Sequence, residues 1–82
     1  MEQGRQNIVG PQIRRLRYQQ GWTQEVLAAR CGRLGWDISR GTLSKVEARL
    51  RCVSDGELLV LAKALKVGVE KLYPTDAERK KT

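Results

Sequence analysis

Four short apolar segments follow one another along this chain, each introduced by a residue that favours the start of a helix. The clearest start is the sequence SDGE at residues 54–57, which stands directly before the apolar segment 58–65. It is a capping-box pattern, because the Ser54 hydroxyl can accept a backbone N–H from Glu57 while the Glu57 carboxylate accepts the N–H of Ser54. The pattern predicts a helix that begins after Ser54 and continues to about Leu65.

The N-terminal half predicts two more helices separated by a glycine. Pro11 suits a first helical turn because its missing N–H would be unpaired there in any case, so the first helix is expected at about 11–20. Gly21 ends it, since glycine enters the left-handed conformation at little cost. Thr23 is the expected N-cap of a second helix that continues to Gly32. The inward side of this second helix is expected to consist of Val26, Leu27, one of Ala28 and Ala29, and Cys31.

A longer connection and a third helix are expected next. Residues 33–38 hold two bulky apolar side chains in a short run, which predicts an extended turn. Ser39 can cap a third helix at about 40–48, and one or two further helical turns are expected between Val69 and Pro74. The expected apolar side chains of the third helix are Leu43, Val46 and, beyond them, Leu50.

Length and patterning together narrow the fold class. A chain of 82 residues has room for one small core, and a hydrophobic content of 40% is enough to form it. Strand-like alternation of useful length is missing. We therefore expect an all-α fold, a compact bundle of four to five short helices. The folded domain is expected over residues 9–74, between a flexible N-terminal arm (1–8) and a charged C-terminal tail (75–82).

Charge and missing residue types restrict the function. The chain has 16 Lys and Arg against 9 Asp and Glu, a net charge of +7, so polyanions are the first partners to consider. It has no histidine, which is the commonest metal ligand and general base. It also lacks a paired-carboxylate site and a glycine-rich phosphate loop. We expect no catalytic site, no metal and no cofactor. No apolar run approaches the roughly 18 residues of a membrane span, so no membrane partner is expected.

The two cysteines, Cys31 and Cys52, do not form a CxxC pair. Two thiols without a histidine do not complete a zinc site of the common kind, and a secreted disulfide framework normally has four or more cysteines. We interpret both as buried or inert thiols of a protein in the reducing cytoplasm, with a functional pair as the alternative.

Three stretches of the chain carry a family resemblance. They are IRRLRYQQGWTQEVLAARCG, ISRGTLSKVEARLR and SDGELLVLAKALKVGVEKL, in this order and spacing. The segment from Val9 to Tyr73, about 65 of the 82 residues, resembles the λ-repressor/Cro-like, XRE-type helix-turn-helix family. The resemblance implies a DNA-binding helix-turn-helix. Members usually pass from the glycine of the second helix to the third helix in one step, whereas here Arg33–Asp37 intervene, so the motif is expected to have an extended turn.

The third helix is the expected reader of DNA. With Leu43 and Val46 facing the core, the opposite arc of the helix projects outward, and a major groove about 12 Å wide admits one helix. Arginine can bond bidentately to guanine, whereas glycine brings no side chain and lets the backbone approach closely. The outward residues, which also match the base-reading positions of the family, are Arg40, Gly41, Ser44 and Lys45. A solvated surface helix is the alternative interpretation.

A second group of residues is expected at the phosphates. The N-terminus of the second helix presents free N–H groups that suit an anion, and Gln24 matches a family glutamine that contacts phosphate or braces Arg40. Arg49 and Arg51 match a basic loop that members of the family lay along the DNA backbone. The expected phosphate-binding residues are Thr23, Gln24, Ser39, Thr42, Arg49 and Arg51.

Other side chains are expected to support the fold. Arg17 and Glu47 match a family pair in which the first and third helices are joined by a partly buried ion pair, which would keep Glu47 away from the DNA surface. Trp22 is expected in the core, and Trp36 is expected to pin the long turn onto the domain, with stacking on a partner as the alternative. Leu72 and Tyr73 predict either a satellite core or a dimer contact.

The function expected from these features is sequence-specific, double-stranded DNA binding by a cytoplasmic transcriptional regulator, acting as a homodimer on two half-sites. The alternative is a protein-binding adaptor or antitoxin-like module on the same scaffold, with a protein partner at an apolar patch around Trp36, Leu50 and Tyr73.

Overall fold

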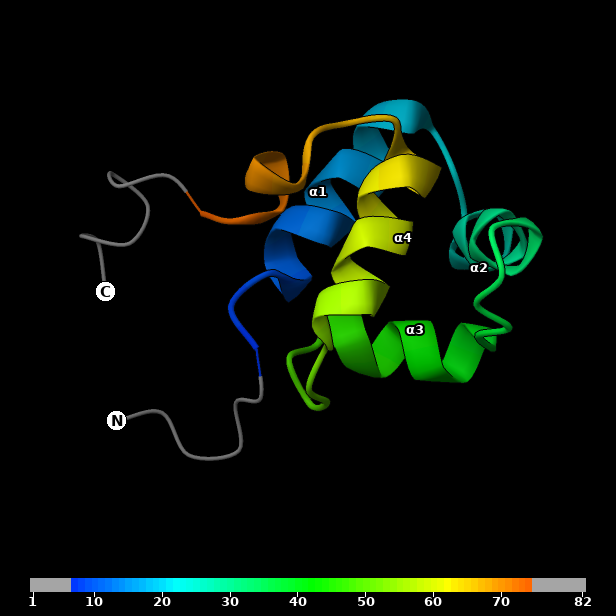
Figure 1. Ribbon diagram of the computed structural model, residues 1–82, viewed down its shortest axis with the longest axis horizontal. Coiled ribbons are helices and arrows are strands. Elements are labelled where there is room, and N and C mark those ends of the chain that lie inside the picture. The colour runs from blue at the N-terminus through cyan, green and yellow to red at the C-terminus, as the bar shows by residue number, and fades with distance from the viewer. Residues whose placement is uncertain (1–6, 75–82) are drawn as a thin grey trace.

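The computed structural model describes residues 7–74, and these form an all-helical domain without strands (Figure 1). The predicted all-α class is therefore confirmed. Expectations for residues 1–6 of the arm and for the tail at 75–82 lie outside the described residues. The elements in chain order are α1 (Gly10–Gln20), α2 (Gln24–Arg33), α3 (Arg40–Glu47), α4 (Asp55–Leu65) and the 3-10 helix η1 (Val69–Leu72).

Side-chain caps start three of the four α-helices. The Thr23 hydroxyl accepts the N–H of Val26 at 3.2 Å, and the Ser39 hydroxyl accepts the N–H of Thr42 at 3.1 Å. At α4 the full capping box is formed, with Ser54 and the third residue of the helix exchanging both hydrogen bonds. Because each bond satisfies an N–H that the helix itself leaves unpaired, these residues set where the helices begin.

The core lies where α4 meets the other helices (Figure 1). α4 packs against α1, α2 and η1, while α3 crosses the ends of the bundle and packs on α1 and α2. Large side chains from every element are completely buried there, so the domain has one continuous apolar interior. The largest of them are Ile13, Leu27, Leu43, Leu61, Leu65 and Leu72.

Helix α2 differs from the sequence-based expectation at its end and in its inward face. It continues through Gly32 to Arg33, and the left-handed glycine that follows is Gly35, with a φ of 102°. Leu27, Ala28 and Cys31 are buried as expected, but Val26 is exposed because the phase of the helix turns it outward.

Leu50, a candidate for the apolar face of the third helix, is also exposed. α3 ends at Glu47, and Arg49 adopts a left-handed φ of 65°, which turns the chain away before Leu50 can continue the apolar face. In the connection before α3, Trp36 is partly buried against the core, and the Arg51 guanidinium lies 5.7 Å from the centre of its ring. Trp36 thus holds the long turn on the domain.

The start of α1 is joined to the end of α3 through Asn7. The side-chain Oδ1 of Asn7 accepts the N–H groups of Val9 and Gly10, and its side-chain Nδ2 donates to the backbone carbonyls of Val46 (3.3 Å) and Arg51 (2.7 Å). One side chain therefore bonds to backbone groups at the start of α1 and at the end of α3 together. Asn7, which the sequence assigns to the arm, contacts the domain extensively.

Gly10 permits the close approach of α1 to the end of α3. A Cβ atom at Gly10 would collide with the backbone oxygens of Val46 and Glu47, which belong to the last turn of α3. Because glycine has only a hydrogen in place of Cβ, α1 can lie directly against α3 here.

Candidate nucleic-acid interface

Helix α3 has one buried side and one exposed side. Leu43, Val46 and Glu47 are buried, and they fix the helix on α1 and α2. The opposite side carries the four residues expected to read bases. All four are exposed, so no part of the described chain, including the connection before α3, covers this side. They are Arg40, Gly41, Ser44 and Lys45.

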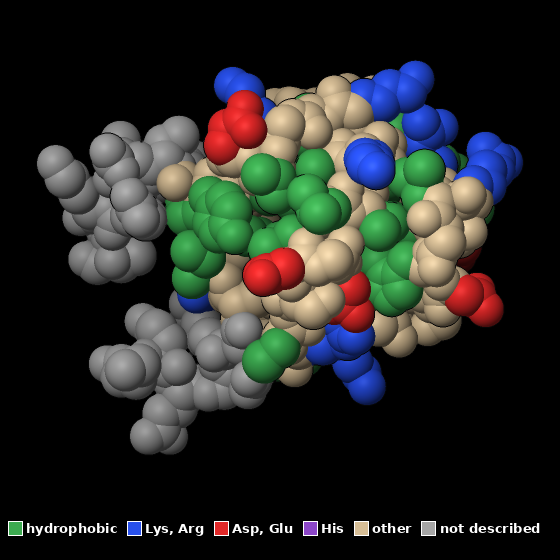
Figure 2. Space-filling view, viewed as in Figure 1, with side chains coloured by type: hydrophobic (Ala, Val, Ile, Leu, Met, Phe, Trp, Pro, Cys, Tyr) green, Lys and Arg blue, Asp and Glu red, His purple; other side chains and the backbone are tan. Residues whose placement is uncertain are grey.

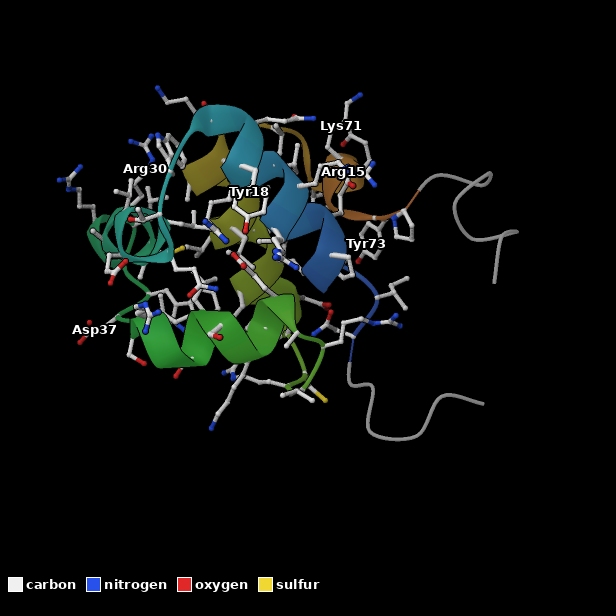
Figure 3. All side chains as sticks on the ribbon, turned by 180° about the vertical axis from the view of Figure 1, so that it is seen from behind. Arg15, Tyr18, Arg30, Asp37, Lys71 and Tyr73 are labelled. Carbon is white, nitrogen blue, oxygen red and sulfur yellow. The ribbon has the colours of Figure 1, made fainter. Side chains whose placement is uncertain are left out.

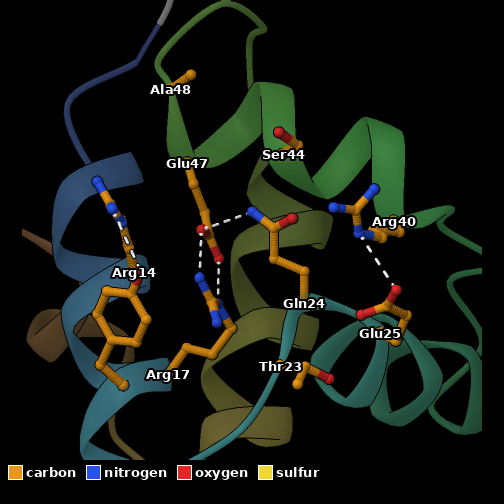
Figure 4. Close-up of a pocket in the computed structure, with 10 residues that line it drawn as sticks. Arg14, Arg17, Thr23, Gln24, Glu25, Arg40, Ser44, Glu47 and Ala48 are labelled. Atoms are coloured by element: carbon orange, nitrogen blue, oxygen red, sulfur yellow. Dashed lines mark hydrogen bonds and ion pairs between the residues drawn. The ribbon is translucent and has the colours of Figure 1, made fainter.

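A groove of about 490 Å³ runs beside α3, between this helix, α1 and the start of α2 (Figure 4). It combines a polar floor with flanking arginines, an environment that suits an anionic ligand. The groove brings together several of the expected DNA contacts with the residues of the ion pair. Its lining residues are Arg14, Arg17, Tyr18, Thr23, Gln24, Glu25, Arg40, Ser44, Glu47 and Ala48.

The floor of the groove is a buried ion pair between α1 and α3. Nε of Arg17 lies 2.7 Å from Oε2 of Glu47, and Nη2 donates to Oε1 at 3.0 Å. A further bond from Nη1 to the Trp22 carbonyl occupies the remaining edge of the guanidinium. The hydrogen bond with Glu47 raises the pKa of Arg17 above its usual value. The Glu47 charge is thereby neutralised inside the protein and does not face a ligand.

Gln24 joins α2 to the same network, because its amide nitrogen donates to Oε1 of Glu47 at 3.0 Å. This fixes the first turn of α2 relative to α3. Gln24 thus braces Glu47, whereas a brace on Arg40 was one of its two expected roles; the other, contact with phosphate, stays a prediction. The brace that Arg40 does have comes from Glu25, whose Oε2 lies 3.3 Å from Nε of Arg40, a pairing that sequence reasoning missed (Figure 4).

Arg14 and Tyr18 form the α1 wall of the groove. Nη2 of Arg14 donates to the Tyr18 hydroxyl at 3.2 Å, and the guanidinium groups of Arg14 and Arg17 lie 5.3 and 4.7 Å from the centre of the ring. The Arg14 hydrogen bond lowers the pKa of Tyr18. Figure 3 shows Tyr18 on the side of α1 that faces α3. The pair adds a cationic, hydrogen-bonding edge to the groove.

The other expected phosphate ligands have partners within the domain. The Thr23 and Ser39 hydroxyls are helix caps, and Ser39 also bonds to the Thr42 hydroxyl at 3.1 Å. Arg49 donates from Nε to the backbone carbonyl of Asn7 at 2.7 Å. Arg51 holds Glu57 through both terminal nitrogens, at 3.1 and 3.2 Å.

These partners draw the two arginines toward the body of the domain. The structure therefore brings Thr23, Gln24, Arg40 and Ser44 together at the groove, and it places Arg49 and Arg51 in contacts that hold α1 and α4 to the end of α3.

Neither thiol belongs to the groove. Cys31 is buried, and burial raises its pKa to about 11; Cys52 is exposed. Within residues 7–74 no cluster of histidine, cysteine or carboxylate residues could hold a metal ion. Among these residues there is also no helix with the length and apolar character that crossing a membrane requires.

Comparison with known proteins agrees with this architecture. The chain is similar to the restriction-modification controller protein C.AhdI from Aeromonas hydrophila, with 34% identity and a TM-score of 0.71 over 79% of this chain and 91% of that chain. It is also similar to the hypothetical transcription factor NHTF from Neisseria, with 30% identity and a TM-score of 0.74 over 90% of this chain and 79% of that chain.

No curated protein sequence matches the chain. The model of the helix-turn-helix family, in contrast, matches residues 13–72. This range includes α2, α3, α4 and η1 completely, and all of α1 except its first turn. The chain belongs to the XRE/λ-repressor-like helix-turn-helix family of DNA-binding transcription regulators.

Proposed function

We propose that this protein is a sequence-specific transcriptional regulator that inserts α3 into the major groove of double-stranded DNA. The observation that carries the proposal is the two-sided character of α3, which is anchored by buried residues and presents Arg40 and Lys45 on its exposed side. Arg40 is the expected partner of a guanine, and Lys45 is a second cationic donor. The solved neighbours, named a controller protein and a transcription factor, support a role in regulation.

The groove supplies a site for the DNA backbone. A phosphate there would meet the free N–H groups at the start of α2 and the cationic side chains of Arg14 and Arg40. Such contacts orient the domain without reading sequence, and the exposed side of α3 then reads the bases.

We propose that the regulator acts as a homodimer. Figure 2 shows hydrophobic side chains gathered over α4 and η1, and those of Leu59, Val69 and Tyr73 are exposed. Burial of this face against a second copy would remove apolar surface from water, which favours association. Two copies of α3 would then meet half-sites about one helical turn, or roughly 34 Å, apart.

The test is selection of bound duplexes from a random pool, followed by anisotropy titrations of the selected duplex and of a scrambled duplex. We expect a palindromic consensus and an affinity that falls with salt, with a log–log slope of about −0.9 for each phosphate neutralised. Arg40→Ala should lower discrimination at one guanine by about 1–3 kcal/mol.

Lys63→Ala is the matched control, because it removes one exposed positive charge from α4, away from the proposed reading surface. It should leave discrimination unchanged. An absence of duplex preference and of salt dependence in the unaltered protein would refute the proposal. Copurification with one protein partner, combined with unaltered behaviour of the Arg40→Ala/Lys45→Ala variant, would favour the adaptor function instead.

A further inference from the structure

We infer that Glu25 is a positioning residue that sets the specificity of Arg40, an inference that rests on the proposed function. Glu25 lies in the first turn of α2, and its Oε2 atom is 3.3 Å from Nε of Arg40, the first residue of α3. Both side chains are largely exposed, at 62% for Arg40 and 69% for Glu25, so the pair lies on the surface that a duplex would contact.

The geometry leaves the reading edge of Arg40 available. A guanidinium has five N–H donors, and contact with Glu25 through Nε leaves the four on the two terminal nitrogens. In Figure 4 these terminal nitrogens lie on the side away from Glu25. They form the fork that can bond to O6 and N7 of a guanine.

The backbone at Glu25 is held in place by the buried network beneath the groove. Its neighbour Gln24 is hydrogen-bonded to Glu47, which is held in the buried ion pair with Arg17. The first turn of α2 is therefore tied to α3, and this places the carboxylate of Glu25 beside Arg40. Arg40 approaches DNA in one orientation, whereas an unpaired arginine would sample many rotamers and donate to acceptors on other bases.

This role differs from simple repulsion by an acid near DNA. A repelling carboxylate lowers the affinity for every duplex equally, so its removal would raise the affinity for specific and nonspecific DNA by the same factor. A positioning carboxylate repels every duplex in the same way, but it also stabilises the specific complex by orienting Arg40. Removal of Glu25 should therefore raise nonspecific affinity and lower the ratio of specific to nonspecific affinity.

The experiment measures that ratio for Glu25→Gln, using the selected duplex and the same duplex with the guanine opposite Arg40 replaced. We expect the ratio to fall by about two- to fivefold, the range that an exposed charge pair supports. Asp37→Asn is the control, because Asp37 is an exposed acid just before α3 (Figure 3). It should alter both affinities equally and keep the ratio.

Two further variants separate the explanations. Glu25→Asp keeps the charge but shortens the side chain, so the ratio should fall here as well; an undiminished ratio would show that charge alone matters and would overturn the inference. In an Arg40→Ala background, Glu25→Gln should leave the ratio unchanged, and a further fall would show that Glu25 does not act through Arg40. Melting curves of each variant check that the fold is intact.

The result also separates this inference from the proposed function. If the unaltered protein fails to prefer any duplex, the proposed function itself fails. If it discriminates well and Glu25→Gln discriminates equally well, only the positioning role is refuted.

Discussion

Replacement of Gly10 by alanine tests the contact between α1 and α3. The new methyl group would meet the backbone oxygens of Val46 and Glu47, and the side chain of Arg49 would lie 3.2 Å away. Backbone atoms in the last turn of a helix cannot move aside as a flexible side chain can. Forcing an extra carbon into a packed site costs about 1–3 kcal/mol, and the helical preference of alanine over glycine returns at most about 0.5–1 kcal/mol. We therefore expect Gly10→Ala to lower the free energy of unfolding by about 1–2 kcal/mol.

Gly56→Ala is the matched control for this measurement. Gly56 also lies in the first turn of a helix, but a Cβ atom there would have no neighbour within 4 Å. This variant should be neutral or slightly stabilising. Urea unfolding followed by circular dichroism at constant pH gives both free energies, and Gly10→Ala should also lower Tm by roughly 5–15 °C in a domain of this size. If Gly10→Ala were as stable as the unaltered protein, the close approach of the two helices would be refuted.

Three more predictions concern charges and thiols. Glu47→Ala should lower the free energy of unfolding by about 3–5 kcal/mol, because it leaves the buried Arg17 guanidinium unpaired; equal denaturation midpoints would contradict this. Because the hydrogen bond from Arg51 lowers the pKa of Glu57, this pair stabilises the fold above the ordinary glutamate pKa, about 4.3, and its contribution is lost as the pH falls through the lowered value. The stability difference between the unaltered protein and Glu57→Gln should therefore be largest near pH 7 and should shrink as the pH falls below the ordinary glutamate pKa in parallel urea titrations. In thiol labelling at pH 8, Cys31 should react only as fast as the protein opens, since it is buried with a pKa of about 11; rapid labelling in the folded state would refute its burial.

Helix starts could be predicted because their chemistry is local. Ser54 and Glu57 are three positions apart, and each side chain accepts the backbone N–H of the other, so these bonds depend only on the helix that the two residues begin. The same holds for the caps at Thr23 and Ser39. Helical periodicity likewise indicated which side of α3 would be buried. The expected end of α2 at Gly32 was wrong, because glycine is tolerated inside a helix and α2 continues through Gly32 to Arg33.

Contacts between distant residues could not be derived from local patterns. Arg17 and Glu47 are 30 positions apart, and only the family resemblance implied that they meet. The pairing of Glu25 with Arg40 depends on how the long connection sets α2 against α3, which no spacing rule gives. The positive charge of Arg51 predicted a contact with DNA phosphate, but in the folded chain its guanidinium forms an ion pair with the Glu57 carboxylate at 3.1 Å.

Asn7 has a practical consequence for anyone who purifies this protein. Its side chain bridges the beginning of α1 and the end of α3, so the polypeptide enters the domain beside the helix proposed to read DNA. An affinity tag or fluorescent fusion joined directly to Asn7 would lie next to that helix and compete with the duplex for space. Labels for binding measurements therefore belong on the duplex, and an N-terminal tag should be cleaved before any titration.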